Sequence, residues 1–166
     1  MDMLVTTGGA SVGDHDLIIA SLKERGLFLD FWKIAMRPGK PLLFGNLGPT
    51  HVLGLPGNPV SALVCAILFL VPAVNALLGL PADPPPVTQA ELGAAVPAND
   101  SRADHLRATL RRGDSGALIA TPFPVQDSSM LRRLALADGL ILRPPLAPAL
   151  PAGALVPVIR LDSFGI

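Results

Sequence analysis

A glycine-rich turn near the start of the chain could bind an anion. The turn, Thr7-Gly8-Gly9-Ala10-Ser11-Val12-Gly13-Asp14, lies between a short apolar run and a helical pattern. Glycines let backbone N–H groups and a helix N-terminus approach a phosphate, and the hydroxyl of Ser11 or Thr7 can add a hydrogen bond. The spacing matches neither the dinucleotide-binding fingerprint nor the P-loop. From geometry alone, phosphate binding and an ordinary strand-to-helix turn both remain open.

Two carboxylates, Asp14 and Asp16, belong to the end of this turn. They would repel a phosphate unless one of them caps the next helix or a divalent cation bridges carboxylate and phosphate oxygens. A plain capping role stays open for Asp14, whereas we expect Asp16 to act with a metal ion.

A second cluster of charge surrounds the turn Arg37-Pro38-Gly39-Lys40-Pro41. Together with Lys33, this turn gathers three cations in a chain that has 13 Lys and Arg residues in all. The prolines on both sides of Gly39 restrict the backbone, so that Arg37 and Lys40 could face an oxyanion at a small entropic cost. A solvated surface turn is the alternative.

A third loop, Gly54-Leu55-Pro56-Gly57-Asn58-Pro59-Val60-Ser61, repeats the order of strand, glycine loop and helix start. Asn58 can cap the helix, and Pro59 suits its first turn. Capping explains these two residues but not both Pro56 and Gly57, which favours a second anion-binding loop.

The composition excludes several other classes of function. The 13 basic residues balance 13 acidic ones, so no overall field would attract nucleic acid or an anionic membrane. The single Cys65 cannot form an internal disulfide and fits a reducing cytoplasm. His15, His51 and His105 lack the spacing of zinc ligands. Six arginines in the second half of the chain predict a solvated basic face on the second domain. They are Arg102, Arg107, Arg111, Arg112, Arg132 and Arg133.

The apolar pattern places the three loops in an α/β layer structure. Met1–Thr6 has the pattern of a strand that is covered on both faces. Leu17–Arg25, followed by Gly26, predicts a helix with a glycine stop. Three further segments are strand-like, namely Phe31–Met36, Pro41–Gly45 and His51–Leu55.

An uncharged window, Val60–Leu80, approaches the roughly 20 residues that span a bilayer. Ser61, Pro72 and Asn75 interrupt this window, and it lacks flanking aromatic and basic belts. We therefore predict a buried, partly kinked core helix and no contact with a membrane.

Prolines in Leu80–Pro86 indicate a stiff connector, which sets domain bounds of 1–82 and 83–166. The second domain has short apolar segments separated by turn residues, a pattern typical of a small, mostly β domain. Its strand-like segments are Ala117–Thr121, Gly139–Arg143 and Leu155–Leu161, and its single helix is expected at Ser129–Ala137.

Taken in this order, the three loops resemble those of the MoeA/gephyrin E-type molybdopterin molybdenumtransferases. Two segments of the second domain, Arg102–Arg107 and Gln126–Leu131, also agree with the family. The resemblance implies an α/β fold: part of a MogA-like three-layer α/β domain, followed by a small, mostly-β, barrel-like domain. Adenylyltransferases of the same pathway and competence-damage-type proteins are the alternative. The Arg37–Pro41 turn, the complete Pro56–Pro59 loop and the trailing β domain favour the molybdenumtransferases.

The resemblance implies insertion of molybdate into adenylylated molybdopterin with release of AMP, in a step that depends on Mg²⁺. It implies the catalytic residues Asp16, Lys33, Arg37 and Lys40, with Asp16 near the metal. Contacts to the pterin nucleotide and to molybdate are expected from Gly8, Gly9, Ser11, Gly13, Pro41, Pro56, Gly57, Asn58, Pro59, Ser61, Arg107 and Ser128.

Two departures from the family pattern qualify this expectation. The family usually has Lys where this chain has Arg37, which keeps the charge but changes the donor geometry. The resembled enzymes also carry further N-terminal domains, so we expect this polypeptide to turn over poorly alone and to form homodimers through those regions. A cytoplasmic location and an adenylyltransferase partner follow from the resemblance, and a non-catalytic oligomerisation or scaffold module is the second alternative.

Overall fold

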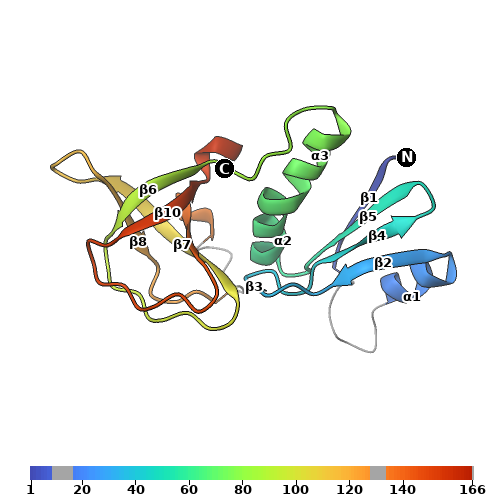
Figure 1. Cartoon of the computed structure of the whole chain (residues 1–166), viewed down its shortest axis with the longest axis horizontal. Coiled ribbons are helices and arrows are strands. Elements are labelled where there is room, and N and C mark those ends of the chain that lie inside the picture. Colours follow the sequence, from blue (N-terminus) through green and yellow to red (C-terminus); the bar gives the residue numbers. More distant parts are fainter. Residues whose placement is uncertain (9–16, 128–133, 166) are drawn as a thin grey trace. The chain divides into compact units, whose positions relative to one another are not determined.

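The chain is described by a computed structural model that covers residues 1–8, 17–127 and 134–165. It divides into two compact units (Figure 1): residues 1–34 with 38–84, and residues 35–37 with 85–166. The sequence suggested a boundary after residue 82, and the units divide after Pro84. The sequence did not suggest that residues 35–37 belong to the second unit.

The first unit is built on a four-stranded mixed sheet of order β1-β5-β4-β2. β1 (Met3–Thr7) pairs in parallel with β5 (Thr50–Leu55), whereas β4 (Leu43–Leu47) and β2 (Leu27–Trp32) continue the sheet in antiparallel fashion. Helix α1 (Leu17–Glu24) packs Ile19 and Leu22 onto a core of Leu27, Leu43 and Val52. Figure 1 shows α1 on one side of this sheet and helix α2 on the other.

Two details of this sheet differ from the sequence prediction. The strand predicted at Phe31–Met36 begins earlier and ends at Trp32, because Lys33 adopts a positive φ of 92° that breaks the extended backbone. The prediction that the first strand is covered on both faces is wrong, since Val5 is 38% exposed. Within the described residues β1 is an edge strand with β5 as its one partner, which accounts for this exposure.

The long apolar window forms three successive helical segments. These are α2 (Pro59–Cys65), a π-helical turn η1 (Ala66–Leu70) and α3 (Val71–Leu77). The irregular turn lies where a kink was predicted. Pro72 has no N–H to bond the preceding turn, and its ring crowds that turn.

The prediction that this helix is buried is correct for its first half and wrong for its second. Val60 and Val64 are fully buried, whereas α3 contains no buried residue. Among the described residues, Pro59–Leu77 is one helix whose length and composition would allow it to cross a bilayer, and 28% of its most apolar window is buried. A single such helix is weak evidence for a membrane span, because core helices of globular proteins share the same features.

The second unit is a small β-barrel. β7 (Ala103–Arg112), β8 (Leu118–Pro122), β6 (Val87–Leu92), β10 (Leu155–Arg160) and β9 (Gly139–Arg143) pair in that order, and β9 pairs back with β7 to close the ring. The short β3 (Met36–Arg37) adds to β7, and a 3-10 turn η2 (Asp162–Phe164) follows β10. An α/β unit followed by a barrel confirms the predicted fold class.

The barrel core consists of apolar side chains from every strand of the ring. Buried members of this core are Ala90, Leu92, Val96, Ala108, Ala120, Ile141, Val156 and Val158. The strands predicted at 117–121, 139–143 and 155–161 are confirmed to within one residue at each end. The helix predicted at Ser129–Ala137 lies largely outside the described residues.

Candidate functional site

Two of the predicted glycine loops lie against each other in the first unit. Gly8 has a positive φ of 82° and donates its N–H to the carbonyl oxygen of Leu55 at 3.1 Å. A Cβ atom added to Gly57 would lie 3.3 Å from the Cα atom of Gly8. The two backbones therefore approach so closely that side chains on both residues would push the loops apart.

A cavity of about 450 Å³ lies beside these loops. Of the residues expected to contact a ligand, Pro56, Gly57 and Pro59 line it, together with Thr7. Apolar residues of β5, α2 and the start of η1 complete the lining, and they are Leu55, Ala62, Leu63 and Ala66. A cavity with apolar walls and backbone groups at its rim suits a flat heterocycle that carries a polar substituent.

Asn58 and Ser61 lie at the start of the helix that follows the third loop. The Oδ1 atom of Asn58 accepts hydrogen bonds from the backbone N–H groups of Val60 at 3.0 Å and Ser61 at 3.2 Å. Ser61 is 6% exposed and does not line the cavity. The capping interpretation of Asn58 is therefore correct, and the structure gives neither residue a place on the cavity wall.

The turn that contains Lys40 is held in place by its backbone. The carbonyl oxygen of Lys40 accepts hydrogen bonds from the N–H groups of Ile34 at 2.9 Å and Leu42 at 3.1 Å. Pro38 and Gly39 are buried, whereas Lys40 is exposed. Its ammonium group makes no hydrogen bond or ion pair to any residue that the structure describes. Lys40 thus presents a positive charge on a rigid support.

Cys65 lies beneath this turn. It is fully buried, and its thiol donates a long, weak hydrogen bond of 3.8 Å to the carbonyl oxygen of Gly39. Burial raises the pKa of the Cys65 thiol to about 12. The neutral thiol is favoured in the folded protein, so its contribution to stability is present below the unfolded-state pKa of about 8.5 and is lost as the pH rises toward 12.

We therefore expect Cys65 to resist modification in the folded protein. A disulfide-exchange reagent at pH 8 should label it at least about a hundredfold more slowly than in the urea-unfolded chain, because the thiolate is the reactive form. The release of the chromophore measures both rates. Equal rates in the two states would contradict the burial of this thiol.

The three cations that the sequence grouped together differ in their local contacts. The Nζ atom of Lys33 lies 4.2 Å from the ring centroid of Trp32, which is a cation–π contact. Arg37 belongs to the second unit through β3, whereas Lys40 belongs to the first. A joint role of these cations around one oxyanion stays a prediction.

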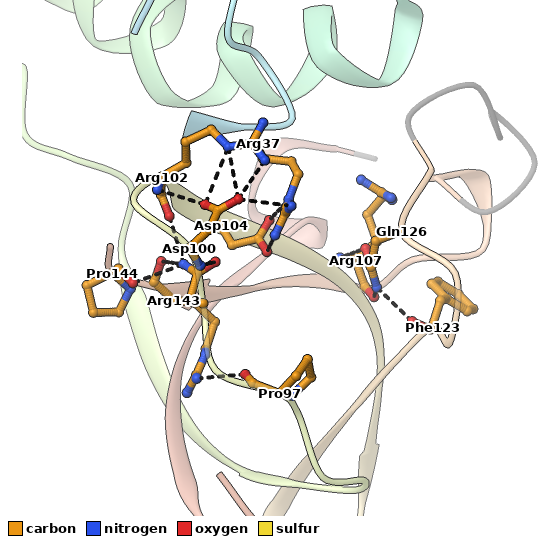
Figure 2. A network of polar contacts seen from close by, with 11 residues as sticks. Arg37, Pro97, Asp100, Arg102, Asp104, Arg107, Phe123, Gln126, Arg143 and Pro144 are labelled. Atoms are coloured by element: carbon orange, nitrogen blue, oxygen red, sulfur yellow. Dashed lines mark hydrogen bonds and ion pairs between the residues drawn. The ribbon is translucent and has the colours of Figure 1, made fainter. Parts of the chain in front are cut away.

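Arg37 is bound by carboxylates (Figure 2). Its Nε and Nη2 atoms donate to the two oxygens of Asp104 at 3.1 and 2.5 Å, and its Nη1 atom lies 3.5 Å from Asp100. Arg102 donates to Asp100 as well, at 2.6 Å, and these bonds lower the pKa of that carboxyl to about 2. The four side chains form a network without net charge at neutral pH.

Asp100 and Asp104 were not recognised from the sequence as functional partners. Asp104 is 6% exposed and lies within β7, and a buried carboxylate requires a cation nearby. The burial of Asp104, however, could not be predicted from the sequence, because aspartates are usually solvated. Its partner, 67 residues away, carried no local signal.

Arg107 is 1% exposed, so the expectation of a solvated basic face fails for this residue. The side-chain amide of Gln126 bonds to both backbone groups of Arg107, each at 2.9 Å. The Nη2 atom of Arg107 donates to the carbonyl oxygen of Asp127 at 3.4 Å. Figure 2 shows Arg107 beside Gln126, where the guanidinium is held at the barrel wall.

Several predicted site residues lie outside the described residues, namely Gly9, Ser11, Gly13, Asp16 and Ser128. Asp16, the expected Mg²⁺ ligand, is one of them. In the part of the chain that the structure describes, no group of three or more His, Cys, Asp or Glu residues is arranged to hold a metal ion.

Two histidines have local structural contacts. The ring of His51 stacks on the ring of Phe44, and burial lowers the pKa of the His105 imidazole.

Family models match both units of the chain. A model described as the probable molybdopterin binding domain matches residues 1–76. A second model, described as the MoeA C-terminal region (domain IV), matches residues 89–161.

Whole-chain relatives agree with these matches. Molybdopterin molybdenumtransferase 2 of Mycobacterium tuberculosis (strain CDC 1551 / Oshkosh) is 35% identical over 145 residues, which cover 84% of this chain and 35% of the relative. Molybdopterin molybdenumtransferase of Bacillus subtilis is 31% identical over 161 residues, which cover 97% of this chain and 37% of the relative. This chain thus spans little more than a third of the length of either relative.

A solved structure extends the likeness to three dimensions. The crystal structure of the molybdopterin biosynthesis MoeA protein from Pyrococcus horikoshii superposes with a TM-score of 0.75 at 30% identity. The superposition covers 96% of this chain and 37% of that protein. With a molybdopterin-binding unit followed by a domain IV barrel, this chain belongs to the MoeA family and corresponds to its C-terminal part.

Proposed function

We propose that this chain forms part of a molybdopterin molybdenumtransferase, which inserts molybdate into adenylylated molybdopterin and releases AMP. The observation that supports this most is the close packing of Gly8 against Gly57 beside the cavity of about 450 Å³. Relatives with the same two domains carry the name of this activity.

In this proposal the pterin nucleotide binds at the glycine loops. Thr7, Gly8, Pro56, Gly57 and Pro59 shape the pocket, because they line the cavity or fix its neighbouring loop. Gly9, Ser11 and Gly13 extend the same turn and remain predicted phosphate contacts. Asn58 and Ser61 act indirectly, by starting the helix at the edge of the pocket.

We assign molybdate to Lys40, with Pro41 supporting its turn. A tetrahedral dianion requires a fixed cation, and a charge on a rigid turn loses little entropy on binding. Arg107 and Ser128 remain predicted molybdate contacts. Arg37 becomes a positioning residue, because two carboxylates already bind its guanidinium.

Bound Mg²⁺ would neutralise charge on the phosphate and so assist the departure of AMP. Asp16 is the residue of this chain that we propose as its ligand. A cytoplasmic location, homodimer formation and contact with the adenylyltransferase of the pathway are further parts of the proposal.

Calorimetric titration of the chain with Mg-AMP tests the nucleotide part of the proposal. We expect saturable binding that is lost in Asp16→Ala and is unchanged in Asp30→Ala, an aspartate that bonds to Asn46 on the sheet. If Mg-AMP produces no saturable heat while the chain still self-associates in sedimentation, the scaffold alternative replaces this function.

A further inference from the structure

We propose that the barrel carries a second anion site, which binds the phosphate group of a small phosphorylated molecule. The site is a cavity of about 290 Å³ whose lining residues include Arg111, Arg112 and Arg160. Asp138 and Asp162 are its other charged lining residues. This inference goes beyond the proposed transferase function and does not depend on it.

The cavity is distinct from the residues of the barrel assigned above. Arg107 and the Asp104 network lie in the first half of β7, whereas Arg111 and Arg112 lie at its end. A strand rises about 3.4 Å per residue, so Arg111 is roughly 24 Å from Asp104 along β7. No residue proposed for the pterin or molybdate lines this cavity.

The charges in the cavity favour an anion. The lining contains three arginines and two aspartates, which leaves an excess of one positive charge in a chain whose formal net charge is zero. Both carboxylates already accept bonds: Asp162 pairs with Arg160, and Asp138 accepts from the N–H of Leu110 at 2.9 Å.

The N–H donors of these three arginines, in contrast, outnumber the acceptors that they contact. Each guanidinium has five N–H groups. Arg112 uses Nη1 to donate to the carbonyl oxygen of Gly116 at 3.0 Å, and Arg160 uses Nε and Nη2 toward Asp162. The guanidinium of Arg111 makes no hydrogen bond or ion pair within the described part of the chain. A phosphate supplies the acceptor oxygens that these donors lack, and paired N–H groups of arginine match its geometry.

The frame of the cavity is fixed by the barrel backbone. Asp138 donates its N–H to Ala108 and accepts from the N–H of Leu161, each at 2.9 Å. The carbonyl oxygen that binds Arg112 belongs to a tight turn closed by the bond from Gly116 N–H to Gly113. Arg112 and Arg160 are thus oriented before a ligand arrives, which lowers the entropic cost of binding. The volume suits a phosphate with a body of a few carbon atoms rather than a large cofactor.

Titration of the ¹⁵N-labelled chain with inorganic phosphate and with glycerol 3-phosphate, at low salt and followed by NMR, tests this site. We expect saturable shifts of the amides of residues 110–112, 138 and 160–162 with either ligand, and none with glycerol. Tighter binding of glycerol 3-phosphate would identify an organic phosphate as the ligand, and equal binding would identify free phosphate.

Variants decide whether the shifts come from this cavity. Arg111→Ala should weaken binding at least about tenfold, while the remaining spectrum stays unchanged because Arg111 is exposed. Arg25→Ala removes the same charge from an exposed position of the first unit and should leave binding intact. Lys40→Ala should also leave it intact, which separates this site from the proposed molybdate site. Shifts that do not saturate, or an equal loss in Arg25→Ala, would overturn the proposal.

Discussion

Replacing Lys40 with alanine is expected to weaken molybdate binding by about 10- to 100-fold. A hydrogen bond to a charged group contributes about 1.5–3 kcal/mol, which converts to this range of affinity. Lys40 is exposed, and its turn is held by backbone bonds to Ile34 and Leu42, so the loss should appear as weaker binding and not as unfolding. Isothermal titration with sodium molybdate measures the effect.

Lys33→Ala is the matched control for this prediction. It removes the same charge from an exposed residue of the same unit, but the ammonium of Lys33 lies over the ring of Trp32. We expect a change in molybdate affinity of less than about threefold, since this cation is already bound to an aromatic face. If both variants lose affinity equally, a general attraction by positive charge explains the binding, and Lys40 has no specific role.

Local patterns in the sequence were sufficient to predict the barrel strands whose residues are mainly apolar. β9 carries the run Gly139–Arg143 with buried residues on both faces, and β10 alternates around Val156 and Val158. Turn residues separate both runs from their neighbours. The presence of β9 and β10 could therefore be predicted from the order of apolar residues alone.

β7 was not predicted from the sequence, because charged residues interrupt its apolar pattern. Asp104 and Arg107 are 6% and 1% exposed within this strand, although both residue types are usually solvated. Their burial depends on partners elsewhere in the chain: Arg37 for Asp104, and the backbone oxygen of Asp127 for Arg107. Such pairings follow from the closed barrel and not from the residues next to them in sequence.

The glycine loops show the same limit at the candidate site. The sequence suggested that the Gly8 turn and the Pro56–Pro59 loop bind a common ligand, and the parallel pairing of β1 with β5 accounts for their proximity. Both loops follow the carboxyl ends of these strands, so Thr7 and Leu55 become neighbours in the ladder. The sequence offered Asn58 as a helix cap, which is confirmed, but it could not show how closely Gly57 approaches Gly8.

Asp104→Asn is expected to lower the free energy of unfolding of the second unit by about 1–2 kcal/mol. The substitution keeps the shape of the side chain but removes the charge that accepts two bonds from Arg37. A fully buried pair would lose about 3–5 kcal/mol when one partner is removed, but the side chain of Arg37 is 42% exposed and water replaces part of the interaction. Urea denaturation of the chain measures the loss.

Asp100→Asn serves as the control, because Asp100 contacts the same arginine through a single 3.5 Å approach and its side chain is 44% exposed. Its substitution should therefore cost clearly less stability than Asp104→Asn. Hydrogen exchange at the amides of β3 adds a local measurement. These amides should exchange faster in Asp104→Asn, because β3 pairs with β7 over only two residues and is further held by the bonds of Arg37. If Asp104→Asn leaves both stability and exchange unchanged, the carboxylates do not anchor Arg37. The guanidinium then becomes available for direct contact with an oxyanion, as the sequence alone suggested.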